Sequence, residues 1–147
     1  MTIKYQILYR ACDKVQSAHK GKRPLGLTKT QIIKVCFYSI YQAIQGMSYK
    51  FVIVGDDLSQ ELLNFFDLFD DIIIDNDNLG STSKSLQKQI DLALEVPDDE
   101  WVYMCEDDYL HTQFSFQYIS EFIENKERYL KTSPKKKNYI NRIIGDL

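Results

Sequence analysis

The sequence Trp101-Val102-Tyr103-Met104-Cys105-Glu106-Asp107-Asp108 is a short apolar run that stops on three consecutive carboxylates. An apolar run rich in aromatic and branched residues indicates a strand in the core of a sheet. Ligands of α/β proteins bind in the crevice at the carboxyl ends of such strands. We therefore interpret 106–108 as a ligand-binding strand end. The alternative interpretation is a solvated acidic turn.

The three adjacent carboxylates also suggest which ligand they bind. Like charges at one strand end repel one another and gain little from protein partners alone. A hard divalent cation that bridges them to the phosphates of a ligand would relieve this repulsion. The strand end therefore predicts a site for a divalent cation and a phosphorylated ligand.

Strand and helix patterns alternate along the rest of the chain. The expected strands lie at 3–9, 49–54, 72–74 and 101–105. The expected helices lie at 30–45, after the cap Ser59, between Ser81 and Pro97 with Leu86, Ile90 and Ala93 on one face, at 114–130 and at 139–147. This alternation predicts an α/β fold with a Rossmann-like, mostly parallel sheet and helices on both of its faces.

Parallel strands place their carboxyl ends along one edge of the sheet, so the segments that follow the expected strands should lie together. These segments are 10–13, Asp56-Asp57, 75–81 and 106–108. Each acidic group alone is an ordinary turn former or helix cap. Their repetition at one sheet edge favours a ligand site.

Length and composition limit the classes of protein to consider. The 147 residues fit one domain, and a formal charge of -3 gives nucleic acid no general attraction. The three cysteines form no metal-binding pattern and are expected to be reduced thiols of a cytoplasmic protein. No stretch approaches the ~20 apolar residues of a membrane-spanning helix, so any membrane contact would be peripheral.

Three segments resemble the nucleotide-binding half of GT-A-type glycosyltransferases of the family-2-like group. They are YKFVIVGDDLS at 49–59, NDNLGS at 76–81 and WVYMCEDD at 101–108, and the resemblance extends over roughly residues 3–130. It implies a domain at 1–130 that binds a nucleotide-diphosphate sugar, with a UDP-sugar favoured, and that transfers the sugar to an acceptor hydroxyl. Residues 131–147 would form a basic linker and a short helix.

The resemblance also implies roles for individual acidic residues. Glu106 and Asp108 occupy the outer positions of a DXD-like motif that binds Mn²⁺ or Mg²⁺, and Asp107 would be a ribose contact or a second ligand. Asp57 would be the carboxylate on the uracil side, with Asp56 as its neighbour.

Basic and neutral residues complete the implied site. Backbone groups of Arg10 and Ala11 resemble the segment that walls the base, and Lys84 lies where the family places a basic residue toward the diphosphate or sugar. An exposed helix lysine is the alternative for Lys84. Lys20, Lys22 and Arg23 are either phosphate contacts or a solvated basic loop. His111 is more often a hydrogen-bonded residue than a metal ligand in such a position.

The resemblance implies an acceptor half that follows the metal motif, and we expect the 147 residues to be too few to include it. That half supplies the general base that deprotonates the acceptor hydroxyl, and no acid after residue 108 fits this role well. The chain would then be a truncated protein, a split or degenerate gene product, or a donor-binding module that needs a partner chain. Two alternatives remain: a receiver-like domain that binds Mg²⁺ and accepts a phosphoryl group, and a noncatalytic α/β interaction domain.

Overall fold

The computed structural model describes residues 3–14 and 23–131, and the chain divides into two compact units. The first unit is Met1–Gln113, and the second is Phe114–Leu147. The predicted linker and final helix at 131–147 lie outside the described residues, apart from Lys131. Within the described part, no helix is both long and apolar enough to cross a bilayer.

The first unit contains a four-stranded sheet in which every pairing is parallel. Its strands are β1 (Lys4–Ala11), β2 (Ser48–Asp56), β3 (Ile72–Asp77) and β4 (Trp101–Glu106). Their order across the sheet is β3-β2-β1-β4. All four predicted strands are present, and the predicted α/β fold is confirmed.

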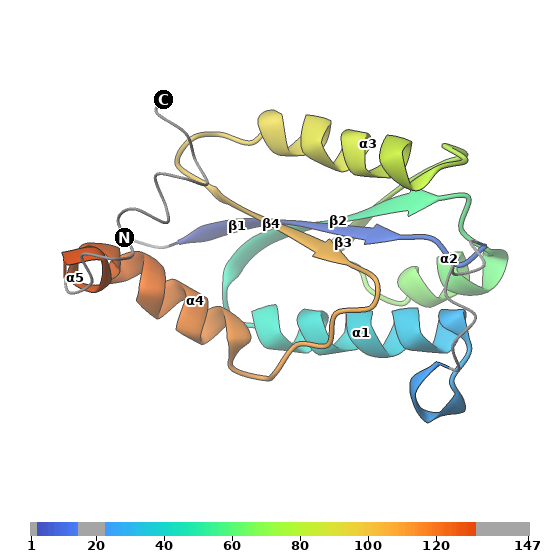
Figure 1. Ribbon diagram of the computed structural model, residues 1–147, viewed down its shortest axis with the longest axis horizontal. Helices are drawn as coiled ribbons and strands as arrows, with labels where there is room; N and C mark the ends of the chain where they lie inside the picture. Colours follow the sequence, from blue (N-terminus) through green and yellow to red (C-terminus); the bar gives the residue numbers. More distant parts are fainter. Residues whose placement is uncertain (1–2, 15–22, 132–147) are drawn as a thin grey trace. The chain divides into compact units, whose positions relative to one another are not determined.

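Helices cover both faces of this sheet (Figure 1). Helix α1 (Lys29–Ile44) and the short helix α2 (Gln60–Phe66) lie on one face, whereas α3 (Thr82–Leu94) lies on the other. The short 3-10 helix η1 (Pro24–Gly26) precedes α1. Helix α1 connects β1 to β2 over one face of the sheet, and α3 connects β3 to β4 over the other. The gap between the ends of β1 and β4, which are neighbours in the sheet, is therefore a topological switch point.

Local sequence explains where α1 begins and ends. The Thr28 hydroxyl accepts a hydrogen bond from the backbone N–H of Gln31, and the Gln31 side chain accepts one from the backbone N–H of Thr28. This reciprocal capping box satisfies two N–H groups that the helix leaves unpaired. Gly46 follows the helix with a φ of 82°, a conformation that glycine adopts without steric cost.

The two faces of the sheet bury different kinds of side chain. On the α1 face, Phe37 is fully buried and packs edge-on against the rings of Tyr9 and Phe51, with centroid distances of 5.8 and 5.5 Å. On the α3 face, Leu8, Val52 and Val54 form a smaller cluster to which Leu92 and Ala93 add.

The predicted apolar face of α3 is wrong in part. Leu86 and Ile90 are exposed, whereas the polar residues Ser85 and Gln89 are buried. The Gln89 amide donates hydrogen bonds to the carbonyl of Leu8 (2.7 Å) and to that of Cys105 (3.2 Å). A buried amide is tolerated here because its N–H groups bond to carbonyls of both β1 and β4.

Two element boundaries also differ from prediction. Strand β3 continues to Asp77, so the turn predicted from Asn76 begins two residues later. The single helix predicted at 114–130 is two helices, α4 (Ser115–Glu124) and α5 (Lys126–Lys131), which make up the described part of the second unit. Asn125 separates them with a φ of -107°, and its amide donates to the Glu121 carbonyl. Asparagine competes in this way with helical hydrogen bonding.

Candidate functional site

A cavity of about 670 Å³ lies at the carboxyl ends of β1 and β4. Arg10, Ala11 and Cys12 line it after β1, and 106–108 line it after β4. Thr82, at the start of α3, lines it as well. The cavity therefore occupies the topological switch point, where open α/β sheets bind their ligands.

Five of the eight residues to which the family resemblance gives a role line the cavity. They are Arg10, Ala11, Glu106, Asp107 and Asp108. Asp56, Asp57 and Lys84 are not among the described residues that line it. Because β2 and β4 both run parallel to β1, the acids that follow β2 and those that follow β4 nevertheless lie at the same edge of the sheet.

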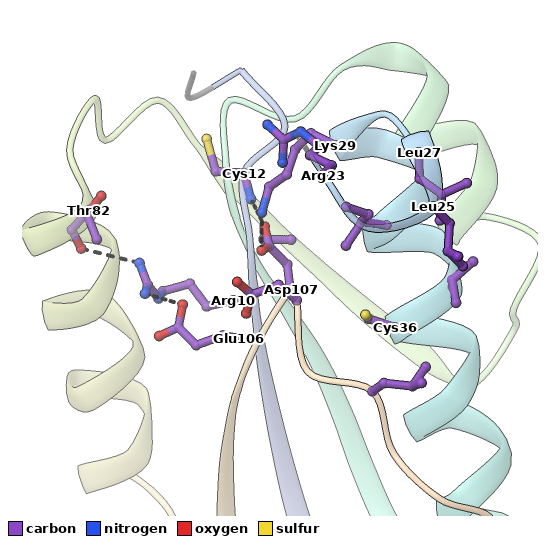
Figure 2. Close-up of a pocket in the computed structure, with 15 residues that line it drawn as sticks. Arg10, Cys12, Arg23, Leu25, Leu27, Lys29, Cys36, Thr82, Glu106 and Asp107 are labelled. Carbon is purple, nitrogen blue, oxygen red and sulfur yellow. Dashed lines mark hydrogen bonds and ion pairs between the residues drawn. The ribbon is translucent and has the colours of Figure 1, made fainter. Parts of the chain in front are cut away.

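Glu106 is paired with a cationic side chain of the neighbouring strand. Arg10 and Glu106 are directly opposite each other in the register of β1 and β4, and their side chains form an ion pair. Figure 2 shows Arg10 between Glu106 and the N-terminal turn of α3, where it donates a long hydrogen bond of 3.5 Å to the Thr82 carbonyl.

Asp107 is the buried carboxylate of the site, with 8% of its surface exposed. Its side chain forms an ion pair with Lys29 of α1 and accepts a hydrogen bond of 3.0 Å from the backbone N–H of Cys12 (Figure 2). Burial raises the pKa of Asp107, and the nearby Lys29 ammonium opposes this effect. Asp107, at the end of β4, therefore interacts with both the end of β1 and the start of α1.

Asp108 differs from its two neighbours because it is exposed and lines the cavity. Among residues 3–14 and 23–131, it makes no ion pair. The same described ranges contain no group of three or more His, Cys, Asp or Glu side chains that could hold a metal ion.

These ion pairs correct the electrostatic argument made from the sequence. The expectation that the carboxylates gain little from protein partners is wrong for Glu106 and Asp107, because Arg10 and Lys29 compensate their charges. Relief of repulsion among 106–108 is therefore no argument for a cation. Any metal must be argued from the oxygen donors that remain accessible.

Asp56 has a structural role in the described structure. It is buried, and one carboxylate oxygen accepts hydrogen bonds from the backbone N–H groups of Leu79 (2.8 Å) and Gly80 (3.0 Å). These bonds fix the loop between β3 and α3, which leads to Thr82 at the cavity. The structural alternative for a single acid, a turn-stabilising residue, thus accounts for Asp56.

Asp57 follows β2 in a left-handed backbone conformation, with a φ of 50°. Its carboxylate forms an ion pair of 2.7 Å with Lys14, and both side chains remain about half exposed. The Asp57 N–H donates to the Asp77 carbonyl at 2.6 Å. Few non-glycine residues adopt this conformation, and Asp is among those that tolerate it.

Lys29 and an apolar wall were missed by sequence reasoning. The wall consists of Leu25, Leu27, Ile32, Val35 and Leu110. Arg23 also lines the cavity, whereas Lys20 and Lys22 lie outside the described residues. The position of Lys29 directly after the cap Thr28 was the available signal, because a first-turn residue of a helix that follows a strand lies near the carboxyl edge of the sheet.

His111 and Cys105 lie beside the site and have unreactive surroundings. The His111 ring is 2.9 Å from the Tyr103 hydroxyl and 4.0 Å from the Cys105 sulfur. Burial lowers the pKa of His111 and raises the pKa of Cys105 to about 12. A neutral thiol packed in this way acts as a small apolar group.

Comparisons of the chain with models of protein families, with curated proteins and with solved structures find no match. Arguments about function therefore rest on the cavity and on the residues that surround it.

Proposed function

We propose that this chain is the nucleotide-binding half of a metal-dependent GT-A-type glycosyltransferase. It would bind a nucleotide-diphosphate sugar, with a UDP-sugar favoured, for transfer to an acceptor hydroxyl in polysaccharide or glycoconjugate synthesis. The observation that carries the proposal is the cavity at the switch point between β1 and β4, which brings together Arg10, Ala11 and 106–108.

The size and lining of the cavity support a ligand of this class. About 670 Å³ falls within the range of ~300–1,000 Å³ that is usual for small-molecule sites. Apolar side chains such as Leu27 and Ile32 provide a surface for a base or a sugar, while charged groups at the strand ends suit a diphosphate. Backbone groups of Arg10 and Ala11 would contact the nucleotide base.

The oxygen donors of the site fit a divalent cation that is shared with phosphates. Mg²⁺ usually retains several waters and is held by one or two carboxylates together with substrate phosphates. Asp108 would supply one carboxylate, and Glu106 would supply a second once it separates from Arg10. When bound, Mn²⁺ or Mg²⁺ would neutralise charge on the diphosphate leaving group.

The remaining implied contacts lie outside the lining of the cavity. Asp57 would approach the uracil side from the end of β2, and Lys84 would reach the diphosphate from the first turn of α3. Asp56 would act indirectly through its hydrogen bonds to the loop that carries Leu79 and Gly80.

The acceptor half and its general base would be supplied by residues outside this domain, for example by a partner chain. A cytoplasmic location fits the three free thiols Cys12, Cys36 and Cys105. Any membrane contact would be peripheral and would involve the basic segment 131–138.

Calorimetric titration of UDP and GDP, with and without Mn²⁺, tests this function. We expect UDP to bind more tightly than GDP, and we expect Mn²⁺ to strengthen UDP binding by about tenfold or more. Asp108→Asn should remove most of the Mn²⁺ effect because it removes one anionic ligand. The matched control Asp98→Asn changes an exposed residue that precedes β4 and should behave as wild type.

The proposal fails if neither nucleotide binds, or if Asp108→Asn retains the full Mn²⁺ effect. Absence of all nucleotide binding would favour the noncatalytic interaction domain. The receiver-like alternative has a specific observation against it, because flavodoxin-like sheets place β3 beside β1. Here β3 lies beside β2, at the far side from β4.

A further inference from the structure

We propose that the cavity binds the diphosphate through Arg10 and Lys29, which exchange their carboxylate partners for phosphate oxygens, and that this exchange frees Glu106 for the divalent cation. The inference rests on the proposed function, since it assigns the phosphate end of the same donor. It adds a metal-independent binding step and two cationic residues whose side chains had no assigned role.

The described residues that line the cavity have balanced charges. Among residues 3–14 and 23–131, three cationic and three anionic side chains line it: Arg10, Arg23, Lys29, Glu106, Asp107 and Asp108. An approaching diphosphate therefore meets no net negative lining, and metal-free binding is not opposed by the charge of the site. Glu106 and Asp107 are the counter-ions of Arg10 and Lys29. A diphosphate carries the same negative charge as these carboxylates and can replace them.

Arg10 has the strongest structural reason to accept a phosphate. Only 13% of its side chain is exposed, and in the described part of the chain its buried Nε–H has no hydrogen-bond partner. Its bond to the Thr82 carbonyl, at 3.5 Å, is at the limit of hydrogen-bonding distance. A guanidinium offers five donors in a planar fork that matches phosphate geometry, and here several of those donors are poorly used.

Lys29 approaches the same cavity from the opposite face of the sheet. It is the first residue of the 16-residue helix α1, and 20% of its side chain is exposed. Its ammonium has three donors, so it binds a phosphate oxygen while Asp107 keeps its hydrogen bond from the Cys12 N–H. Asp107 thereby remains satisfied in part when Lys29 turns to the ligand.

The exchange couples anion binding to cation binding. A diphosphate that takes Arg10 leaves Glu106 without its cationic partner, next to the exposed Asp108. A divalent cation then finds two carboxylates and the phosphate oxygens together. Because coupling between two ligands is reciprocal, a cation must strengthen diphosphate binding by the same factor by which the diphosphate strengthens cation binding.

Calorimetry with inorganic pyrophosphate as the probe tests this order of events. We expect wild-type protein to bind pyrophosphate without metal, and Mg²⁺ to strengthen that binding. Glu106→Gln keeps the size of the side chain but removes the charge that competes for Arg10. This variant should bind pyrophosphate about threefold to tenfold more tightly without metal and should lose most of the Mg²⁺ effect.

Two variants that remove a positive charge should instead weaken pyrophosphate binding. Lys29→Gln and Arg10→Gln should each weaken metal-free pyrophosphate binding about tenfold, because each removes a charge-assisted contact. The matched control is Lys34→Gln, since Lys34 pairs with Glu61 on the helix surface at 2.7 Å and does not line the cavity. Thermal unfolding of each variant identifies any that fails to fold, and Arg10→Gln keeps the test open if Lys29→Gln does.

The inference is overturned if pyrophosphate needs Mg²⁺ to bind, or if folded Glu106→Gln binds metal-free pyrophosphate no better than wild type. Failure of the proposed function looks different. If pyrophosphate follows the variant pattern but UDP shows neither uridine preference nor Mn²⁺ dependence, then the anion site stands and the glycosyltransferase proposal falls. If UDP binds only with Mn²⁺ and its affinity is unchanged in Arg10→Gln and Lys29→Gln, then the glycosyltransferase proposal stands and the anion site falls.

Discussion

The variant Lys29→Met tests how strongly the ion pair with Asp107 stabilises the fold. Methionine keeps the length and the apolar stem of the lysine side chain but removes its charge. The Asp107 carboxylate, which is 8% exposed, would then lose its cationic partner and keep only the hydrogen bond from the Cys12 N–H. A buried carboxylate without a counter-ion destabilises the folded state.

The size of the effect follows from the burial of the two partners. Removal of one partner of a fully buried ion pair costs about 3–5 kcal/mol. The Lys29 side chain is 20% exposed and Asp107 retains one hydrogen bond, so we expect about 2 kcal/mol. For a chain of this length, that loss corresponds to a decrease in melting temperature of about 6 °C.

Urea unfolding followed by circular dichroism measures this free energy. The matched control is Lys34→Met, which breaks the pair with Glu61, a residue whose side chain is 65% exposed. Exposed pairs contribute less than about 1 kcal/mol, so the control should change stability little. The double variant Lys29→Met/Asp107→Asn should recover part of the loss, because it no longer buries an unpaired charge. Equal effects of Lys29→Met and Lys34→Met would refute the argument.

Three further changes follow from single contacts. Gln89→Leu should lower the free energy of unfolding by about 1–2 kcal/mol in urea titrations, because the carbonyls of Leu8 and Cys105 lose a buried donor. Gly55→Ala should lower the free energy of unfolding by about 1–3 kcal/mol in the same assay, since the added Cβ would lie 2.6 Å from the side-chain oxygen of Asn76. Burial lowers the pKa of His111, so the unfolded chain binds protons more readily and stability should fall as the pH drops below 6.5; His111→Gln should flatten this slope in thermal unfolding. Unchanged stability in any of these cases would contradict the corresponding contact.

The strands were predictable because each is a compact apolar run that ends on polar residues. The run that ends at Val54 is buried from Phe51 onward, as expected. The predicted core position of the run that ends at Cys105 is wrong, because β4 lies at the edge of the sheet and Trp101, Val102 and Met104 are exposed. Both runs lead into acids at one edge of the sheet. Alternation with helices then implied parallel pairing and a ligand edge. This much of the site follows from local pattern and from the handedness of crossovers.

The partners of the acids were not predictable in the same way. Arg10 and Glu106 are 96 residues apart in the chain and become neighbours only through the register of β1 and β4. Lys29 and Asp107 are 78 residues apart, and they come into contact because α1 begins close to the end of β4. No local periodicity indicates either pair. The acidic residues were therefore visible in the sequence, but the cationic side chains that neutralise them were not.

The α3 face illustrates a second limit. Apolar spacing favoured Leu86 and Ile90, but tertiary hydrogen bonding selected Gln89 for the buried side. The buried carbonyls of Leu8 and Cys105 stabilise a buried amide on the helix that packs over them, and hydrophobic periodicity does not predict such a contact.

Chemical-shift mapping with UDP and Mg²⁺ on the isotopically labelled chain locates the ligand site directly. We expect the first backbone amides to shift to be those of 10–12 and 106–108, where β1 and β4 end at the cavity. Shifts confined to the opposite edge, around Ser48 and Ile72 at the starts of β2 and β3, would contradict a ligand site at this cavity, as would a spectrum that does not change at all.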